Sequence, residues 1–178
     1  MKKFLAFDLG AKGGRAMLGE LENDRIRLTE MARFLNTPQQ IAGHWHWNTR
    51  QLSLAMLEGL AKTVRHHPDV LSVGCDTWGV DFVTLDAQYQ LLGEPYCYRD
   101  SRTDGLMGKA FQQVPAEEIY AETGIHFLQL NTLYQFFAAT LGNGPAWSKV
   151  QSCLLMADYF HFLFSGKKVA PTHNQTEN

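Results

Sequence analysis

The feature that most constrains this sequence is a glycine-rich turn between two short apolar runs near the N-terminus. The first run, Phe4–Phe7, is typical of a buried strand, and apolar residues resume at Ala16. Between the runs lie an aspartate and three glycines: Asp8, Gly10, Gly13 and Gly14. A strand, a tight turn and a returning strand form a β-hairpin, so we predict that the chain begins with one.

The predicted turn carries groups that suit a phosphate. Glycines can adopt positive φ, and they let backbone N–H groups converge on an anion without a Cβ in the way. Lys12 and Arg15 add positive charge beside those N–H groups, and Asp8 is suited to hold a hydrated Mg²⁺. We therefore predict that the Gly10–Arg15 turn binds the phosphates of a nucleotide. The alternative is a hairpin whose turn is merely flexible.

Two common nucleotide-binding motifs are excluded. The sequence contains no G-x-x-x-x-G-K-[ST], so the turn is not a P-loop. Its glycines do not follow the spacing G-x-G-x-x-G, and residues 16–21 resume as a strand rather than a helix. The turn is therefore not a dinucleotide-binding fingerprint either.

Charge and composition exclude several kinds of partner. Lys and Arg number 16 and Asp and Glu number 18, a net charge of −2, which favours neither nucleic acid nor an anionic membrane. No apolar run has the length of a transmembrane helix, and Asp8 interrupts the first apolar run too early for a signal peptide. Three cysteines without C-x-x-C spacing are typical of reduced thiols. We therefore expect a cytoplasmic protein.

The following residues predict a third strand and a helix. Residues 25–34 alternate well enough for a third antiparallel strand, and residues 36–46 predict a loop. Asn48 is the expected N-cap of the helix, with Gln51 as its partner, and His66-His67-Pro68 closes it. Helical spacing predicts a buried face formed by Leu57, Leu60, Ala61 and Val64.

The second half of the chain predicts one parallel strand and several helices. Residues 70–75 form an apolar strand directly after a helix, so we expect it to run parallel to a central strand. A hairpin at residues 82–92 follows, then helices at residues 106–113 and 116–122. Asn131 is the expected cap of a further helix, whose predicted inward face is Leu133, Phe136, Phe137 and Leu141. A strand at residues 153–156 and a helix at residues 158–164 complete the order.

This order of elements indicates a fold by analogy. Three antiparallel strands, then a helix, a strand and further helices, are typical of an actin-like, ribonuclease-H-like half-domain. The predicted class is therefore α/β, with a mixed sheet opened by three antiparallel strands and flanked by helices. In such half-domains the first hairpin holds phosphates.

A second candidate site follows the strand at residues 70–75. Asp8 and Asp76 each end an apolar strand, and ligands of α/β sheets bind at the carboxyl ends of strands, so one cleft can receive both. Trp78 offers a flat face for a sugar ring, Gly79 lets the backbone come close, and Asp81 can accept hydrogen bonds from hydroxyl groups. The alternative is an ordinary strand end with one packed tryptophan, and the residues alone leave both interpretations open.

Two other polar clusters favour structural interpretations. One loop holds four charged residues whose composition indicates a surface ion-pair cluster: Arg99, Asp100, Arg102 and Asp104. His44 and His46 alternate with two tryptophans, but a third metal ligand cannot be assigned. We therefore expect a packed loop there rather than a metal site.

These stretches resemble the N-terminal part of rhamnulokinases, a group within the FGGY family of carbohydrate kinases. The resemblance runs almost from end to end. FDLGAKGGRAMLG is similar to the family's first phosphate motif, and VGCDTWGVDFVTLD to its sugar-site strand and loop. YRDSRTDGLM, ETGIHFLQLNTLYQ and LLMADYFHFLFSGK follow in the same order. TWGVDF and NTLYQ are rather specific for rhamnulokinases.

The resemblance implies an ATP-dependent kinase that converts L-rhamnulose to L-rhamnulose 1-phosphate, or a kinase for another deoxyketose such as L-fuculose. It puts the phosphates of ATP on Ala11, Lys12, Gly13, Gly14 and Arg15. Asp8 then lies near Mg²⁺, and Gly79 touches the ketose. Trp78, Asp81 and Asn131 are expected beside Gly79 at the sugar pocket.

The chain also departs from the family pattern. Rhamnulokinases usually carry serines where this sequence has Lys12 and Gly13, so hydroxyl donors are replaced. The family's chains are far longer, and the catalytic aspartate and the adenosine-binding domain are expected beyond residue 178. Residues 169–178 match the expected T-N-A-[ST] stretch only at Asn174.

These departures give two expectations for the chain. Residues 1–178 should form the N-terminal sugar- and phosphate-binding domain, with self-association through an exposed domain interface. The alternative function is a truncated, catalytically inactive remnant that binds sugar or nucleotide.

Overall fold

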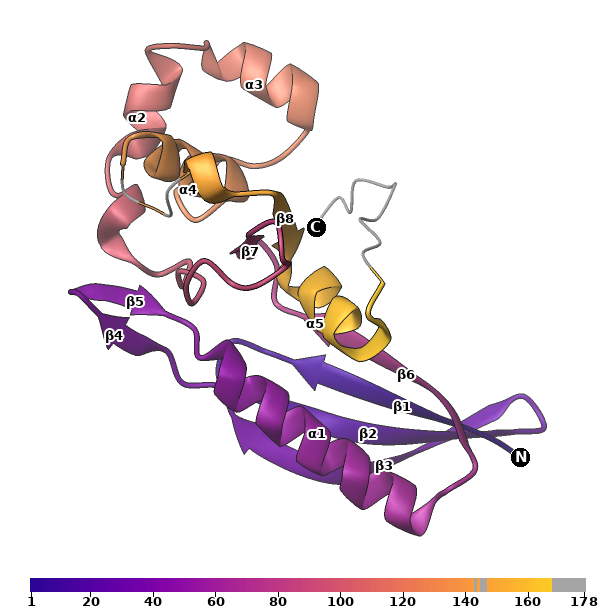
Figure 1. The fold of residues 1–178 in the computed structure, drawn as a ribbon. Coiled ribbons are helices and arrows are strands. Elements are labelled where there is room, and N and C mark those ends of the chain that lie inside the picture. The colour runs from indigo at the N-terminus through magenta and orange to yellow at the C-terminus, as the bar shows by residue number, and fades with distance from the viewer. Residues whose placement is uncertain (143, 145–146, 168–178) are drawn as a thin grey trace. The chain divides into compact units, whose positions relative to one another are not determined.

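The structure is a computed structural model that describes residues 1–142, 144 and 147–167 (Figure 1). These residues divide into two units. The first contains Met1–Gln39, Trp47–Trp78 and the described residues from Met156 onward, and the second contains Gln40–His46 and Gly79–Leu155. Asn174, at which the sequence matches the family's expected stretch, lies outside the described residues.

A four-stranded mixed sheet is the centre of the first unit. The strands β1 (Lys2–Leu9), β2 (Gly13–Glu22) and β3 (Arg25–Leu35) run antiparallel in chain order, and β6 (Val70–Thr77) pairs with β1 in parallel. The resulting order is β3-β2-β1-β6. The predicted opening of three antiparallel strands and the predicted parallel strand are both confirmed.

Two helices cover one face of this sheet. The helix α1 (Thr49–His66) lies across the strands, and α5 (Met156–Ser165) lies against the same face (Figure 1). Phe7 of β1 touches both, because its ring stacks on Phe164 of α5 at 5.7 Å and a Cβ added at Gly59 of α1 would lie 3.5 Å from it. The predicted start of α1 is confirmed: Asn48 accepts a hydrogen bond from the Gln51 N–H at 2.9 Å.

The predicted buried face of α1 is wrong. Its buried residues are Thr49, Leu52, Met56, Gly59 and Thr63, whereas Leu57 is 51% exposed. The reason is the close approach of helix and sheet: a Cβ at Gly59 would lie only 3.3 Å from the Cβ of Ala16. This close contact requires a small side chain at Gly59, so the spacing of Leu57, Leu60 and Val64 does not mark the side that faces the sheet.

A short hairpin occurs where the sequence predicts a loop. The strands β4 (Gln39–Ile41) and β5 (His44–His46) pair across Ala42 and Gly43, which have φ of 51° and 86°. Two-residue hairpin turns with positive φ at both positions usually contain Asn or Asp before Gly. An alanine at the first position hides this signal.

The second unit combines a two-stranded sheet with three helices. The strand β7 (Phe82–Leu85) pairs with β8 (Ser152–Leu155), and the helices are α2 (Leu106–Phe111), α3 (Ala116–Thr123) and α4 (Thr132–Thr140). Short 3₁₀ turns lie at Ser101–Thr103 and Trp147–Lys149. The predicted hairpin at residues 82–92 is reduced to a single bridge, between Leu85 and Leu91.

The predicted inward face of α4 is also wrong in part. Leu133 and Leu141 are exposed, and the buried residues of the helix are Tyr134, Gln135, Ala138 and Ala139. Gln135 can be buried because its amide group finds hydrogen-bond partners inside the unit. No helix among the described residues is long and apolar enough to span a bilayer.

Candidate functional site

A row of four charged side chains crosses the sheet of the first unit at the carboxyl end of β1. The register pairs Asp76 of β6 with Asp8 of β1, Asp8 with Arg15 of β2, and Arg15 with Arg33 of β3. Directly paired residues project from the same face of a sheet, so all four side chains lie on the face opposite Phe7. The row therefore brings the predicted phosphate-site residues Asp8 and Arg15 together with Asp76.

The charges of this row are only partly neutralised. Asp8 and Arg15 form an ion pair between Oδ2 and Nη2, and both side chains are about half exposed. Arg33 donates to Glu30 through Nε at 3.1 Å and Nη2 at 2.6 Å. The hydrogen bond from Arg33 lowers the pKa of Glu30, and the same bond raises the pKa of Arg33. The row thus offers carboxylates at one side and guanidinium groups at the other.

The glycine turn beside this row has neighbouring side chains so close that a larger residue would not fit at Gly14. Gly10 N–H donates to the Gly13 carbonyl at 2.8 Å and closes the turn. Glycines can adopt positive φ, but the backbone of Gly10, Gly13 and Gly14 does not adopt it. A Cβ on Gly14 would instead lie 2.6 Å from the Cδ2 of Leu9 and overlap the ring of Phe34. Close approach, rather than backbone conformation, is therefore why glycine occurs there.

Asn36 supports the same turn and was missed by the sequence analysis. It is buried at the end of β3, where its Nδ2 donates to the Gly10 carbonyl at 3.0 Å and its backbone N–H donates to the Lys12 carbonyl at 3.3 Å. Both ends of the turn are thus tied to one residue. A polar residue directly after a strand was the available signal, but its partner lies 26 residues earlier in the chain.

Asp8 and Asp76 are the residues that could hold Mg²⁺ at this site. They are direct neighbours on β1 and β6, at the carboxyl ends of both strands. Among the described residues, no group of three or more His, Cys, Asp or Glu side chains could hold a metal ion. Mg²⁺ commonly binds through one or two carboxylates together with waters and substrate phosphates. The two carboxylates therefore fit a metal that arrives with a phosphate.

In the second unit, Asp81 is held in the interior. Its side chain is 0% exposed, its Oδ1 accepts from Gln135 Nε2 at 2.8 Å, and its Oδ2 accepts from the Tyr98 N–H at 3.2 Å. A carboxylate in this arrangement presents no surface to a ligand. Asp81 thus joins the turn at Gly79 to Tyr98 and α4, and its predicted contact with a sugar stays a prediction.

The predicted surface ion-pair cluster is wrong for two of its four residues. Asp100 and Arg102 are both buried. Arg102 donates from Nη2 to Gln135 Oε1 at 2.9 Å, and its guanidinium lies 3.9 Å from the centre of the Tyr96 ring. Burial lowers the pKa of Arg102, while Tyr96, Asp100 and Asp81 act in the opposite direction. Burial of a charge is possible here because each charged group has specific partners.

Asp100 is satisfied by backbone and side-chain donors. Its oxygens accept from the Trp45 N–H at 2.7 Å and the Arg102 N–H at 3.0 Å, and Oδ1 lies 3.0 Å from His44 Nδ1. Burial acts to raise the pKa of Asp100, but these N–H groups and His44 outweigh it and lower the pKa. The carboxylate therefore connects β5 to the loop before α2.

Trp78 and Asn131 have separate surroundings. Trp78, the last residue of its segment of the first unit, packs on the buried Trp47 with ring centres 4.5 Å apart. Asn131 precedes α4 as predicted, but its Nδ2 donates to the His126 carbonyl at 2.8 Å, without a side-chain cap. Asn131 and Val80 both line a cavity of about 510 Å³ in the second unit, whose other walls are largely apolar.

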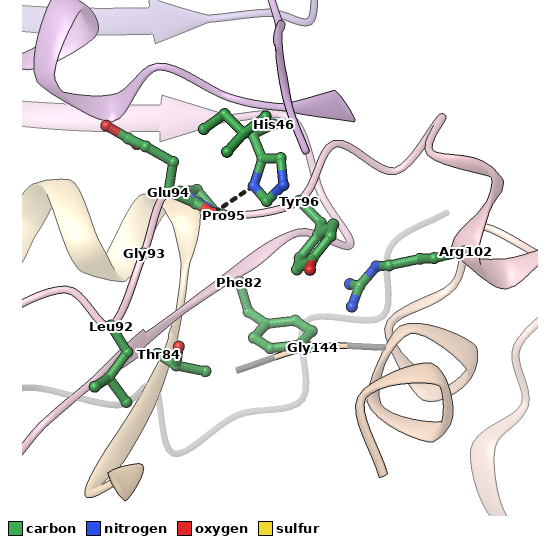
Figure 2. A pocket seen from close by; sticks show the side chains of 11 residues that line it. His46, Phe82, Thr84, Leu92, Gly93, Glu94, Pro95, Tyr96, Arg102 and Gly144 are labelled. Atoms are coloured by element: carbon green, nitrogen blue, oxygen red, sulfur yellow. Dashed lines mark hydrogen bonds between the residues drawn. The ribbon is translucent and has the colours of Figure 1, made fainter. Parts of the chain in front are cut away.

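A smaller cavity of about 340 Å³ lies elsewhere in the second unit (Figure 2). His46, Tyr96 and Arg102 lie along it together with Phe82 and Thr84. His46 Nδ1 donates to the Glu94 carbonyl at 2.7 Å. None of the residues selected from the sequence as site residues lines this cavity, so it is not part of either candidate site.

Comparison with known proteins identifies relatives over the whole chain. Residues 3–175 match the model of the N-terminal domain of the FGGY family of carbohydrate kinases. A rhamnulokinase from Halalkalibacterium halodurans is 41% identical over 176 residues, which are 99% of this chain and 38% of the relative. A rhamnulokinase from Oceanobacillus iheyensis is 39% identical over 172 residues, 97% of this chain and 37% of the relative. The chain thus spans less than two-fifths of the length of these relatives.

Solved structures show the same fold. A ligand-bound xylulose kinase from Lactobacillus acidophilus matches with a TM-score of 0.82 at 16% identity, over 96% of this chain and 34% of that one. A xylulose kinase from Rhodospirillum rubrum matches with a TM-score of 0.79 at 18% identity, over 95% and 36%. These proteins have the actin-like, ribonuclease-H-like fold, and the fold predicted from the order of elements is therefore confirmed.

Proposed function

Because the chain belongs to the FGGY family of carbohydrate kinases, we propose that it is the N-terminal, sugar- and phosphate-binding domain of an ATP-dependent ketose kinase. The proposed reaction is transfer of the terminal phosphate of ATP to L-rhamnulose, giving L-rhamnulose 1-phosphate and ADP. The observation that carries the proposal is the charged row Asp76–Asp8–Arg15–Arg33 beside the glycine turn. The names of the two relatives support the choice of sugar.

The proposed phosphate site works by position and charge. Phosphoryl transfer depends chiefly on alignment and on neutralising the charge of the phosphate oxygens. The Gly10–Arg15 turn offers N–H groups, with Lys12 and Arg15 as cations, and Asp8 and Asp76 offer oxygens to hydrated Mg²⁺. Bound Mg²⁺ supplies positive charge against the phosphates. Asp8 already orients Arg15 through their ion pair. When the nucleotide binds with Mg²⁺, this ion pair is exchanged for two contacts between opposite charges, Arg15 with phosphate and Asp8 with hydrated Mg²⁺.

The proposed sugar site lies at the turn Gly79–Asp81 and the cavity beside it. Three walls of this cavity are the apolar side chains of Ile125, Leu128 and Leu155, and its polar groups include Asn131. An apolar wall with few polar groups suits a sugar that ends in a methyl group, as L-rhamnulose and L-fuculose both do. Gly79 follows Asp76 by three residues, so the chain alone keeps the two within about 11 Å.

Asp8→Asn tests the phosphate site in a kinase of which this chain is the N-terminal domain. The substitution removes the charge that would face Mg²⁺ and keeps the shape of the side chain. Turnover should fall at least tenfold while the melting temperature changes by only a few degrees, about what an exposed ion pair contributes. Asp24→Asn, in the turn between β2 and β3, is the matched control and should keep its rate. Wild-type turnover in Asp8→Asn would rule out the assignment.

Gly79→Ala and Gly79→Val test the sugar site by volume. If the turn faces the ketose, the KM for ketose should rise from glycine to alanine to valine while the KM for ATP stays constant. L-rhamnulose and L-fuculose are assayed side by side, because a lower KM for L-fuculose would replace the proposed substrate. Unaltered ketose dependence in both variants would mean that residues 76–81 are only a packed strand end.

A further inference from the structure

Val80 has a strained backbone next to the proposed sugar-binding residue. Its φ is 67°, in the left-handed region that β-branched residues rarely adopt. The Asp81 N–H donates to the Gly79 carbonyl at 2.9 Å and closes a three-residue turn around Val80. This γ-turn is rare and strained when its central residue has positive φ. Strained residues persist only where their surroundings hold them, and they gather at binding sites.

Two side chains from the start of α4 hold Val80. Thr132 Oγ1 donates to the Val80 carbonyl at 2.8 Å, and Gln135 Nε2 donates to the same carbonyl at 3.2 Å. Gln135 Nε2 also donates to Asp81 Oδ1 at 2.8 Å and to the Leu130 carbonyl at 3.0 Å. The turn is therefore attached to α4 at the strained residue and at the residue that follows it.

The position of Gln135 is itself fixed. Its side chain is 1% exposed, and its Oε1 accepts from Arg102 Nη2 at 2.9 Å. A guanidinium group can only donate, so this bond determines that the NH₂ end of the amide faces Val80. A rigid buried partner can hold a strained turn, whereas a mobile surface side chain cannot.

We propose that Thr132 and Gln135 are positioning residues for the sugar site. By holding Val80 at positive φ they set the direction of the Val80 N–H group, which has no acceptor within the described part of the chain. Val80 and Thr132 line the same cavity as Asn131, so the Val80 N–H belongs to a residue of its wall. The link to sugar rests on the proposed function, whereas the restraint on Val80 does not.

Thr132 provides the sharper variants, because loss of Gln135 would also remove its hydrogen bonds with Arg102 and Asp81. Thr132→Val removes the hydroxyl at nearly constant shape, and Thr132→Ser keeps it. Thr140→Val is the matched control: the same change in the same helix, at a hydroxyl that donates only to the Phe137 carbonyl. All three retain Gln135.

The restraint is measured first, by NMR on the 178-residue chain without substrate. The short distance between HN and Hα within Val80 reports positive φ. This signature should weaken in Thr132→Val and persist in Thr132→Ser and Thr140→Val. An unchanged signature in Thr132→Val would show that the hydroxyl does not hold the turn and would overturn the inference.

The link to sugar is measured second, in the kinase that contains this domain. Loss of one hydrogen bond predicts a rise of about three- to tenfold in the KM for ketose in Thr132→Val, with an unchanged KM for ATP. In a Val80→Gly background the same substitution should have a smaller effect on the ketose KM, because glycine adopts positive φ without strain.

The outcomes separate the inference from the proposed function. Equal ketose KM values in Thr132→Val and Thr140→Val would overturn the positioning role even if the turn changes. If no ketose is turned over by the wild type, the proposed function fails. The NMR measurement would then still decide whether the hydroxyl of Thr132 holds Val80.

Discussion

Asp81 and Asp100 are buried carboxylates that connect loops of the second unit. Each accepts at least one backbone N–H: Asp81 that of Tyr98, and Asp100 those of Trp45 and Arg102. Hydrogen bonds from backbone N–H groups favour the ionised form of a carboxylate and offset the cost of burial. At the residue scale, these two buried carboxylates therefore have a structural role: each holds loops of the second unit together.

Asp100→Asn should destabilise the chain in a pH-dependent way. The pKa of Asp100 is lowered in the folded state, so its contribution to stability is complete above its ordinary pKa of about 4 and is lost as pH falls through the folded value. We expect a loss of about 1–3 kcal/mol in the free energy of unfolding at pH 7, shrinking below about pH 4. Urea denaturation at pH 7 and pH 3 measures the loss of unfolding free energy under both conditions.

The matched control for Asp100→Asn is Asp104→Asn, in the same loop. Its carboxylate accepts an exposed hydrogen bond from Gln129, so the change should be small at both pH values. Equal destabilisation by Asp100→Asn at pH 7 and pH 3 would contradict a role for the ionised carboxylate.

Gly14→Ala should destabilise the Gly10–Arg15 turn by steric overlap. The new Cβ would lie 2.6 Å from both Leu9 Cδ2 and Phe34 Cζ, and overpacking of this kind costs about 1–3 kcal/mol. Gly19→Ala, on the same strand, meets its nearest atom at 3.6 Å and should be neutral or slightly stabilising. Thermal unfolding of the two variants provides the comparison, and equal melting temperatures would show that the turn can open around a methyl group.

At the scale of elements, α1 and α4 each bury a small or polar residue, Gly59 and Gln135, while the leucines Leu57 and Leu133 are exposed. Gly59 of α1 approaches Ala16 and Ala32, and Gln135 of α4 enters the interior to bind backbone carbonyls. Leu57 meanwhile lines a cavity of about 180 Å³ between α1 and α5. The close packing of each helix and the hydrogen bonds it must provide thus decide which of its faces is buried.

Met56→Ala and Leu57→Ala test which face of α1 is buried. Met56 is fully buried, so truncation should cost about 2–5 kcal/mol in the free energy of unfolding. Leu57 is half exposed, and its truncation should cost much less, about 1 kcal/mol. Denaturant titrations of both variants provide the measurement. A larger loss of unfolding free energy in Leu57→Ala than in Met56→Ala would support the buried face predicted from leucine spacing.

At the scale of the whole chain, the described helices of the first unit pack on only one of the two faces of the four-stranded sheet. One face is packed by α1 and α5. The other carries the charged row at one end, and Phe4, Ile26 and Leu28 are exposed along the strands, Ile26 at 68% and Leu28 at 65%. Exposed apolar groups of this kind are typical of surfaces that bind another protein surface or promote self-association.

The isolated chain should self-associate through this sheet face. Sedimentation velocity at increasing protein concentration should show a rising average mass, because association removes apolar surface from water. Ile26→Lys and Leu28→Lys should reduce the effect, whereas Leu54→Lys, at an exposed position of α1, should not. A monomer at all concentrations would contradict the expected association.

The isolated chain should also lack kinase activity. The family resemblance assigns the general base to a residue with no counterpart in these 178 residues, and phosphoryl transfer needs that base, in-line geometry and exclusion of water. Chain incubated with Mg²⁺, ATP and L-rhamnulose should release no ketose-dependent ADP. Sustained release that Asp76→Asn or Asp81→Asn abolishes would show that the base is one of these carboxylates.

The sequence by itself determined most of the local elements and the composition of the glycine turn. Strands β1–β3 and β6, the start of α1 at Asn48 and the grouping of glycines, Lys12 and Arg15 all depend on patterns within a few residues. Alternation, capping and turn composition are local properties, so one chain is enough to predict them.

Only the tertiary structure decided which polar residues are buried and which residues meet. Asn36 binds a turn 26 residues away, and Thr132 binds a carbonyl 52 residues away, at Val80. From the sequence, Gln135 and Arg102 would be expected on the surface. Their buried hydrogen-bond partners lie in other segments, so the residues around them in the sequence do not reveal these partners. A hydrogen bond between distant segments depends on where the chain returns in space, and no periodicity within a segment encodes that.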